Sequence, residues 1–549
     1  MSKATNKTRP GKELAREYYD SGFWQDQTIY QIILNKAEKF ADKIAIEDKY
    51  RNLSYTKLLH SVNSFAKVLA ESGLKSGDKL AVWLPNRLET VVVFLACSKN
   101  HYVCCPSLHR NHSHADVLAI LKRFDISTLI YETNYAADAN ESDFQAELKK
   151  TSTKGYELAP LTDDADLKYP FAVDIKVESK AAKTSLKQDP DTLVYLPFTS
   201  GTTGEPKGVM HSDNTLMANS RAIASDWNFT HESVIYTLSP LSHNLGFGAM
   251  LTALSVGGKI VLSNLSKGES LVNHLVETGA TFIYGVPAHA LDLLNEIKER
   301  DSNLLFSISG FRISGAAAQK SVVSGLLEQG IVPQTGYGMT EAHSHNYTLA
   351  DDEPNLIIES AGKACPGYEL KIWSLQDHDV EVSIGEEGQI GGKGASLMLG
   401  YYDDEQANEN AFNSSVWYMT GDIGILNDDG YLYLSGRIKD IINRGGHKIY
   451  PIPIEKMAEA HEEVQKAAVI AMSDERLGER VCIVVVLEKG SSLQAEQLMK
   501  HLSGAGLSRY DMPEYFARIE ELPLTPSGKL MKRTLVEMLG NGSLVAKSV

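Results

Sequence analysis

The chain has 549 residues, 43% of them hydrophobic and 23% charged, which suits a globular protein of two or more domains. Its formal charge of −16, from 54 basic and 70 acidic residues, argues against nucleic acid as a partner. The five cysteines lack a C-x-x-C pair and fit a reducing cytoplasm, and neither a signal peptide nor an integral membrane segment is expected.

Helix and strand patterns alternate through the first third of the chain. In order, they predict a helix at 29–40 capped by Thr28, a strand at 43–47, a helix at 55–71 opened by Ser54, a strand at 79–84, a helix at 88–99 and a strand at 102–105. Such alternation favours parallel sheets covered by helices, so the predicted fold class is α/β.

Two segments of this region carry weaker signals. His109, His112 and His114 are close enough in sequence to bind a metal, but a polar turn that caps the following helix is the favoured interpretation. Residues 134–190 are polar and irregular, and we predict an exposed connection there.

The most informative stretch is TSGTTGEPKGV at 199–209, which follows a short apolar strand at 193–196. Its glycines let backbone N–H groups turn toward a ligand, its hydroxyl groups add donors, and Lys207 adds positive charge, which together predict a phosphate-binding loop. It is not a Walker loop, because Pro206 precedes the lysine and Gly208 follows it.

TSGTTGEPKGV resembles the signature loop of the adenylate-forming superfamily, which comprises acyl-CoA synthetases, adenylation domains of non-ribosomal peptide synthetases and firefly luciferase. Further motifs of this superfamily follow in its order, as far as Lys529, so the resemblance covers nearly the whole chain. It implies a large N-terminal domain at 1–438, made of helix-covered sheets and a β subdomain. A small, mobile α+β domain at 439–549 follows it.

Three motifs of the large domain resemble substrate-binding segments of the superfamily. SPLSHNLGFG at 239–248 implies that His243 lies beside the acyl carboxylate, although a histidine at a helix start is more often a cap or a core residue. The segment Gly315-Ala316-Ala317 implies an adenine-binding surface. In YGMTE at 337–341 the resemblance implies stacking by Tyr337, a phosphate contact by Thr340 and Mg²⁺ binding by Glu341.

The remaining motifs lie toward the C-terminus. Asp422 follows a predicted tight turn and resembles the residue that binds the ribose hydroxyl groups. Arg437 would contact ribose or phosphate, Lys439 has the hinge position, and Gly445-Gly446 would leave room for a pantetheine arm. Lys529, in the run PLTPSGK at 523–529, resembles the catalytic lysine.

The resemblance therefore implies an AMP-forming acyl-CoA ligase of class EC 6.2.1, with ATP, Mg²⁺ and coenzyme A as cofactors and a carboxylic acid as substrate. Medium-chain or alicyclic acids are favoured, the protein is expected to be cytoplasmic, and a homodimer stays open. The catalytic residues are predicted to be Lys529, Thr340, Glu341 and His243, with Glu341 as metal ligand. The nucleotide and coenzyme A would contact Thr199, Ser200, Gly201, Thr202, Thr203, Gly204, Lys207, Gly315, Ala316, Ala317, Tyr337, Gly338, Asp422, Arg437, Lys439, Gly445 and Gly446.

Two alternatives stay open. One is an adenylating enzyme that loads a carrier protein instead of coenzyme A. The other is a catalytically silent regulator that binds a nucleotide, which the joint presence of Glu341, Asp422, Lys439 and Lys529 disfavours.

Overall fold

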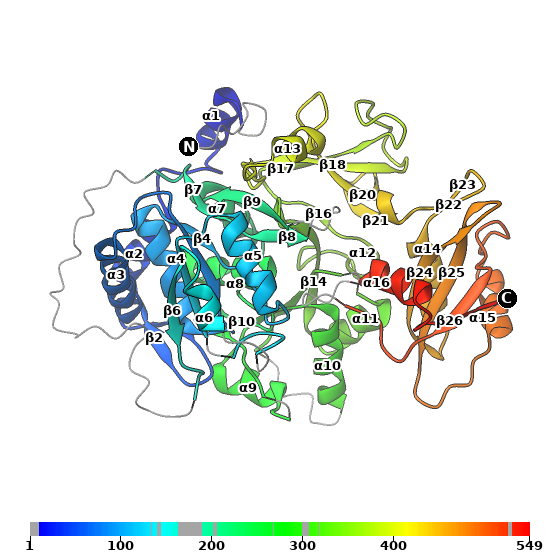
Figure 1. The fold of residues 1–549 in the computed structure, drawn as a ribbon, viewed down its shortest axis with the longest axis horizontal. Helices are drawn as coiled ribbons and strands as arrows, with labels where there is room; N and C mark the ends of the chain where they lie inside the picture. The colour runs from blue at the N-terminus through cyan, green and yellow to red at the C-terminus, as the bar shows by residue number, and fades with distance from the viewer. Residues whose placement is uncertain are drawn as a thin grey trace. The chain divides into compact units, whose positions relative to one another are not determined.

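The fold comes from a computed structural model, which describes residues 10–132, 134–139, 144–162, 189–200, 206–266, 268–298, 307–316, 318–524 and 530–549. Helices alternate with the strands of four sheets, which confirms the α/β class (Figure 1). Two compact units are distinguished, the first formed by Met1–Glu369 and Gly392–Trp417 and the second by Leu370–Gly391 and Tyr418–Val549. The boundary between residues 438 and 439 stays a prediction.

The first unit contains an eight-stranded sheet in the order β19-β9-β7-β4-β3-β5-β6, with β8 paired to β9. Its strands are β3 (Lys79–Trp83), β4 (Val103–Cys105), β5 (Thr128–Glu132), β6 (Lys154–Leu158), β7 (Leu193–Tyr195), β8 (Phe198–Ser200), β9 (Pro206–Ser212) and β19 (Gly400–Tyr401). Two helices, α5 (His114–Arg123) and α6 (Phe144–Leu148), contribute Leu121 and Phe144 to one apolar cluster with the sheet.

The second sheet of this unit has nine strands in the order β16-β15-β14-β13-β12-β10-β11-β1-β2. Their bounds are β1 (Ile44–Glu47), β2 (Asn52–Ser54), β10 (Val234–Thr237), β11 (Lys259–Leu262), β12 (Phe282–Gly285), β13 (Gly310–Ile313), β14 (Val332–Met339), β15 (His343–Tyr347) and β16 (Lys363–Ala364). Side chains of α9 (Leu271–Thr278), α10 (Pro287–Lys298) and α11 (Lys320–Glu328) pack against it, and α12 (Pro354–Glu359) contacts β14.

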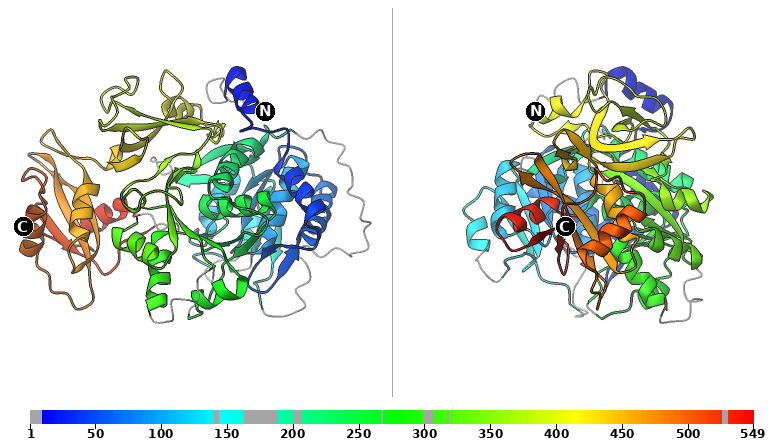
Figure 2. Two further views of the ribbon diagram at one scale, coloured as in Figure 1. Left: turned by 180° about the vertical axis from the view of Figure 1, so that it is seen from behind. Right: turned by 90° about the vertical axis from the view of Figure 1, so that its right-hand side faces the viewer.

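A layer of helices packs against both of these sheets. Figure 2 shows the fold from two further sides. The layer comprises α2 (Ile29–Lys39), α3 (Tyr55–Glu71), α4 (Leu88–Asn100), α7 (Asp213–Asp226) and α8 (Asn244–Val256). Helix α4 packs on β3 and β4, whereas α8 packs on β10, β11 and β12. Twelve of the 13 residues of α4 are buried, as its apolar run requires, since a helix hydrophobic on all sides belongs in a core. Helices α1 (Lys12–Asp20) and α13 (Glu405–Ala411) complete the unit.

The second unit contains a four-stranded and a six-stranded sheet. The four-stranded sheet is β17 (Tyr368–Trp373), β18 (Gly388–Gly394), β20 (Tyr418–Leu426) and β21 (Leu432–Arg437), followed by the short helix η2 (Ile438–Asp440). The six-stranded sheet is β22 (Ile442–Arg444), β23 (His447–Ile449), β24 (Val464–Asp474), β25 (Gly478–Leu487), β26 (Tyr515–Arg518) and β27 (Ala546–Ser548). Its helices are α14 (Pro451–Glu459), α15 (Ala495–Gly504) and α16 (Lys532–Gly540).

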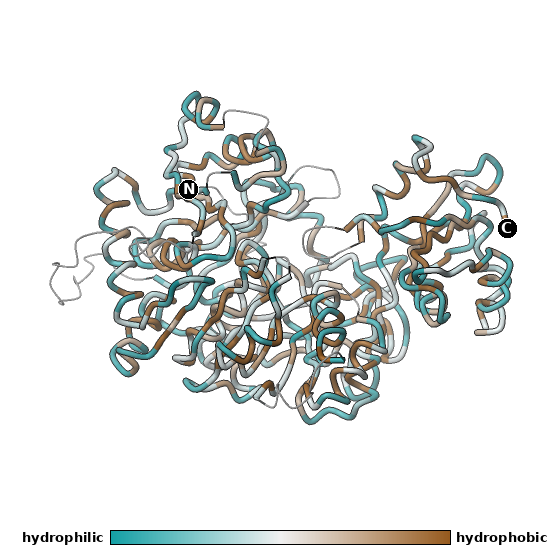
Figure 3. The backbone as a smooth tube through the Cα atoms, turned by 90° about the horizontal axis from the view of Figure 1, so that it is seen from below, coloured by the Kyte–Doolittle hydropathy of each residue, from teal (hydrophilic) through white to brown (hydrophobic). Residues whose placement is uncertain are grey.

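Strand β25 shows why this sheet is covered on both faces. Val481, Ile483 and Val485 join one apolar cluster with α14 and α15, and the alternate residues Cys482 and Val484 join a second cluster with α16. Alternate side chains of a strand point to opposite faces, so a continuous apolar run is a strand buried on both sides. Apolar and polar segments alternate along the backbone (Figure 3).

Local capping signals were reliable. Thr28 and Ser54 cap α2 and α3, as predicted, and Ser212 caps α7. Two expectations were wrong. Residues 134–190 are not wholly an irregular, exposed connection, because 144–148 form helix α6 with Phe144 and Leu148 buried, and 154–158 form strand β6. Asp422 lies within strand β20 instead of after a tight turn. Among the described residues, no helix is long and apolar enough to cross a membrane.

Candidate functional site

The phosphate-binding motif forms a hairpin. Strands β8 and β9 pair in antiparallel register, with Thr199 opposite Lys207 and Phe198 opposite Gly208. A Cβ atom at Gly208 would lie 2.9 Å from the ring of Phe124, so close packing requires this glycine. The tip of the hairpin, with Gly201, Thr202, Thr203 and Gly204, lies outside the described residues.

The YGMTE motif occupies a second hairpin, made by β14 and β15. Tyr337 pairs with Asn346 and is buried, while Thr340 and Glu341 follow the end of β14. Gly338 is required here, because a Cβ atom would lie 2.2 Å from the carbonyl oxygen of His343. Two polar side chains predicted to face the ligand therefore lie on a short, backbone-constrained turn.

Strand β13 brings the predicted adenine-binding segment to the same place. It pairs in parallel with β14, with Ile313 opposite Thr335, so the segments that follow both strands lie at one edge of the sheet. Ser314 Oγ donates to the carbonyl of Gly336 over 3.4 Å, and Gly315 has φ +96°, which favours glycine. Ala316 follows in the described chain, whereas Ala317 lies outside it.

His211 was missed as a residue of this site by the sequence analysis. It is fully buried, and its Nε2 lies 2.8 Å from the carbonyl oxygen of Thr340, while Nδ1 lies 3.1 Å from Thr215 Oγ1. Because a carbonyl can only accept, Nε2 carries the hydrogen. Burial lowers the pKa of His211 to about 4, so the ring is neutral at pH 7 and holds Thr340 by a hydrogen bond, without charge.

Two further histidines belong to this hairpin. His343 and His345 both lie on β15 and are buried. The ring of His343 lies 4.4 Å from that of His211, centroid to centroid, and the ring of His345 lies 5.1 Å from that of Tyr337. Desolvation lowers the pKa of both, to about 4 for His345, so they supply packing and polarity but no positive charge at pH 7.

Tyr401 connects the two hairpins and was also missed. Its hydroxyl donates to Glu341 Oε1 over 2.9 Å, and the ammonium group of Lys207 lies 4.9 Å from its ring centroid. The pairing of β19 with β9 positions this tyrosine, with Tyr401 opposite Val209. One side chain thus touches both the lysine of the phosphate loop and the predicted metal ligand. The pattern of the sequence around Tyr401 offered no signal for this contact.

His243 caps the N-terminus of α8, where Nδ1 accepts from the backbone N–H of Leu245 over 3.3 Å. Asn244 Nδ2 donates to the carbonyl of Met339 over 3.4 Å, which places this helix start beside the YGMTE turn. His243 is therefore a helix cap, and its position beside the YGMTE turn also suits the predicted contact with the acyl carboxylate. Its ring is half-buried.

Three glycines on α8 and on the neighbouring strand β12 differ in how closely their surroundings approach them. A Cβ atom at Gly246 would lie 2.4 Å from the carbonyl oxygen of Pro240, and one at Gly285 would lie 2.9 Å from Phe311. Only Gly248 of these three would meet nothing within 4 Å among the described residues. Phe247 is fully buried and stacks on Tyr195 with ring centroids 4.2 Å apart, so it is a core residue.

The histidines near α5 have partners within the protein. His109 Nδ1 lies 2.9 Å from Ser242 Oγ, and the ring of His112 accepts from the backbone N–H of His109. Burial lowers the pKa of His109 to about 4. Within the described ranges, no group of three histidine, cysteine or acidic side chains could hold a metal ion.

In the second unit, the register of β20 and β21 places Asp422 opposite Arg437. Arg437 Nε lies 3.0 Å from Asp422 Oδ1, and the carboxylate is 13% exposed.

Lys439 is an exposed residue of η2. Gly445 and Gly446, at φ +60° and +91°, form the two-residue turn between β22 and β23, a type I′ hairpin that favours glycine at both positions. Lys529 lies outside the described residues.

Comparison with known proteins assigns the family. Residues 33–402 match the family model described as AMP-binding enzyme, and residues 453–529 match that of the AMP-binding enzyme C-terminal domain. The chain is 31% identical over 523 residues to a medium-chain fatty-acid–CoA ligase of Escherichia coli K12, covering 94% of this chain and 91% of that protein. It is 30% identical to a salicylyl-CoA synthase/salicylate adenylyltransferase of a Streptomyces species, with 96% of each covered.

A solved structure of o-succinylbenzoate CoA synthetase from Bacillus subtilis, in complex with its acyl-adenylate intermediate, superposes with a TM-score of 0.78 at 25% identity. The match covers 93% of this chain and 98% of that one. The motifs, the arrangement of sheets and both family models all indicate the adenylate-forming superfamily. The chain therefore belongs to the AMP-binding enzyme family of adenylate-forming ligases.

Proposed function

We propose that the protein is an AMP-forming acid–thiol ligase that activates a carboxylic acid with ATP and transfers the acyl group to coenzyme A. The observation that carries this proposal is the turn after β14. His211 holds the Thr340 carbonyl and Tyr401 binds the Glu341 carboxylate, next to the start of α8 with His243. Hydroxyl, carboxylate and imidazole groups at one edge of a parallel sheet are suited to binding a nucleotide beside an acid.

In the first step, an oxygen of the acid attacks the α-phosphorus of ATP, and the bond from that phosphorus to the bridging oxygen of pyrophosphate breaks. The products are an acyl adenylate and pyrophosphate. A carboxylate is already ionised at pH 7, so this step needs no general base. What it needs is neutralisation of negative charge, for which Lys207, the hydroxyl of Thr340 and Lys529 are the proposed groups.

The residues present fit a magnesium ion. Glu341 offers a hard carboxylate oxygen, and its other partner, the Tyr401 hydroxyl, fixes its orientation. Mg²⁺ commonly binds through one or two carboxylates and completes its shell with water and substrate phosphates, so a single protein ligand suffices. When bound, the ion would neutralise phosphate charge.

In the second step, the thiolate of coenzyme A attacks the acyl carbon, and AMP leaves with the electron pair of the acyl–oxygen bond. The relative from Escherichia coli is named a CoA ligase, and the Streptomyces relative is named both a CoA synthase and an adenylyltransferase. These names support a CoA ligase as the first choice and a carrier-loading adenylating enzyme as the second. The SPLSHNLGF segment favours medium-chain or alicyclic acids.

A panel assay tests the proposal. Purified protein is given ATP, Mg²⁺ and one acid at a time, from acetate through octanoate, cyclohexanecarboxylate and salicylate, with and without coenzyme A. We expect pyrophosphate release with at least one acid and a thioester product only when coenzyme A is present. Acyl-AMP that accumulates with or without coenzyme A supports the carrier-loading alternative. Nucleotide binding without pyrophosphate release for any acid supports the silent regulator.

A further inference from the structure

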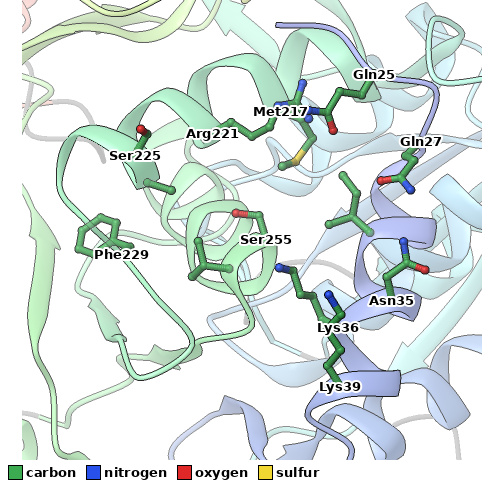
Figure 4. Close-up of a pocket in the computed structure, with 13 residues that line it drawn as sticks. Gln25, Gln27, Asn35, Lys36, Lys39, Met217, Arg221, Ser225, Phe229 and Ser255 are labelled. Carbon is green, nitrogen blue, oxygen red and sulfur yellow. The ribbon is translucent and has the colours of Figure 1, made fainter. Parts of the chain in front are cut away.

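A cavity of about 430 Å³ lies in the first unit, among α2, α7 and the end of α8 (Figure 4). Its polar wall includes Lys36 and Lys39 from α2 and Arg221 from α7. Ile32, Met217 and Phe229 contribute an apolar wall. Among the described residues that line it, none is acidic, although the whole chain carries a formal charge of −16.

Arg221 is incompletely satisfied in this cavity. Its Nη2 donates to the carbonyl of Phe23, whereas its Nη1 is buried and has no hydrogen-bond partner in the described part of the chain. Burial lowers the pKa of Arg221 to about 10, which leaves the guanidinium charged at pH 7. A buried, charged donor without a partner costs free energy, which a rotation of the Arg221 side chain toward an anion in the cavity would recover.

The two lysines add to this excess charge. Burial lowers the pKa of Lys36, and the charge of Lys39 lowers it further. No carboxylate of the described residues forms an ion pair with Lys36, Lys39 or Arg221. Both lysines lie in the last turn of α2, where positive charge offsets the helix dipole, so a purely structural role would explain them. An interaction with the helix dipole does not explain Arg221, because this residue lies before the last turn of α7.

We propose that this cavity binds a small phosphate monoester with a short apolar body. A phosphate monoester carries a charge of about −1.5 to −2 at pH 7, which matches several cations better than one carboxylate does. The planar guanidinium of Arg221 suits phosphate oxygens, and Met217 and Phe229 would cover the apolar body. The volume is within the range of about 300–1,000 Å³ typical of small-molecule sites.

This site is separate from the proposed active site and does not rest on the proposed function. His243 caps the N-terminus of α8, whereas Ser255 and Val256, at the C-terminal end of the same helix, line the cavity. Thirteen residues of helix separate these ends by roughly 18–20 Å at a rise of about 1.5 Å per residue. A ligand bound here would therefore leave the acid- and nucleotide-binding residues uncovered.

Calorimetric titration of the full chain with phenyl phosphate tests the proposal, with inorganic phosphate and phenol as partial probes. We expect one binding event with phenyl phosphate, weaker binding with inorganic phosphate and none with phenol. Arg221→Gln should weaken binding about 10- to 100-fold, the loss that accompanies removal of a charged hydrogen bond. The double variant Lys36→Gln/Lys39→Gln should weaken it as well. Lys67→Gln, an exposed lysine of α3, is the matched control.

Pyrophosphate release by Arg221→Gln should equal that of the wild type, because Arg221 lies outside the proposed catalytic residues. Equal affinity for phenyl phosphate in all three variants would overturn the proposal, because binding would then occur elsewhere. Absence of binding by the wild type at millimolar phenyl phosphate would also overturn it. If Arg221→Gln fails to fold, the lysine double variant decides, since Lys39 is exposed and Lys36 only partly buried.

Discussion

Asp422 and Arg437 face each other across β20 and β21, and their ion pair fixes the carboxylate at the position proposed for ribose binding. Asp422→Ala removes the acceptor for two hydroxyl groups. Each charged hydrogen bond contributes roughly 1.5–3 kcal/mol, so the KM for ATP should rise tenfold or more. Steady-state kinetics with varied ATP measure this, with Asp429→Ala on the exposed β20–β21 turn as control. An unchanged KM in Asp422→Ala contradicts the ribose assignment.

The neutral His211 makes stability depend on pH in a definite direction. Its pKa is about 4 in the folded protein and about 6.5 in the unfolded chain, so the unfolded state binds more protons between these values. The contribution of His211 to stability is therefore complete above pH 6.5 and declines as pH falls toward 4. His211→Gln keeps a donor for the Thr340 carbonyl but cannot titrate.

We accordingly predict that the melting temperature falls less steeply from pH 6.5 to 4 in His211→Gln than in the wild type. Thermal unfolding followed by circular dichroism across this range measures the slopes. His378→Gln, on an exposed turn, serves as control and should keep the wild-type slope. Parallel curves for His211→Gln and the wild type would contradict the low pKa.

At the level of elements, capping residues in the sequence predicted where helices begin, whereas contacts between residues far apart in the sequence could not be predicted. Thr28 and Ser54 identify their helices, because an N-cap is a local property of a few adjacent residues. Strand β6 escaped prediction, since its residues are mostly exposed and only pairing with β5 makes it a strand. His211 and Thr340 are 129 positions apart, and no spacing in the sequence indicates their contact.

Helix α8 offers a matched pair of glycines for testing its packing. At Gly246 a Cβ atom would lie 2.4 Å from the carbonyl oxygen of Pro240, whereas at Gly248 it would meet no atom within 4 Å in the described structure. Gly246→Ala should therefore destabilise the protein, at about 1–3 kcal/mol for overpacking. Gly248→Ala should be neutral or stabilise it by up to about 1 kcal/mol, through helix propensity. Urea unfolding of both variants measures the difference, and equal midpoints would contradict the close approach at Gly246.

The same contrast decides where a substitution can be placed near His243. The backbone around Gly246 leaves no room for a side chain, whereas at Gly248 an added Cβ atom meets no atom of the described residues within 4 Å.

At the scale of the whole molecule, the residues proposed for the two half-reactions lie on different segments of the second unit. Lys529 belongs to one and the Gly445-Gly446 turn to another, so we predict that the C-terminal domain rotates about Lys439 between the steps. Lys529→Ala should slow acyl-AMP formation roughly 10²- to 10³-fold while conversion of supplied acyl-AMP to thioester is nearly unchanged. Gly446→Trp should do the reverse, and Lys439→Pro should slow the second step more than the first.

Rates of both half-reactions in the three variants decide the question. Gly446→Ala is the control for Gly446→Trp, because any side chain strains a residue at φ +91° and only the bulk of tryptophan would block the thiol. Equal damage to both steps in every variant would rule out the rotating domain.

The division of the chain into units has a consequence for how this protein can be cut. The backbone passes between the units after Glu369, after Gly391 and after Trp417, so cleavage at any one of these points leaves two covalent tethers intact. A fragment that begins at Tyr418 would lack β17 and β18 and expose the paired edge of β20, whose free N–H and C=O groups favour aggregation. A fragment of residues 439–549 keeps all six strands of its sheet. We therefore expect that a protein expressed as two pieces, divided between residues 438 and 439, reassembles best.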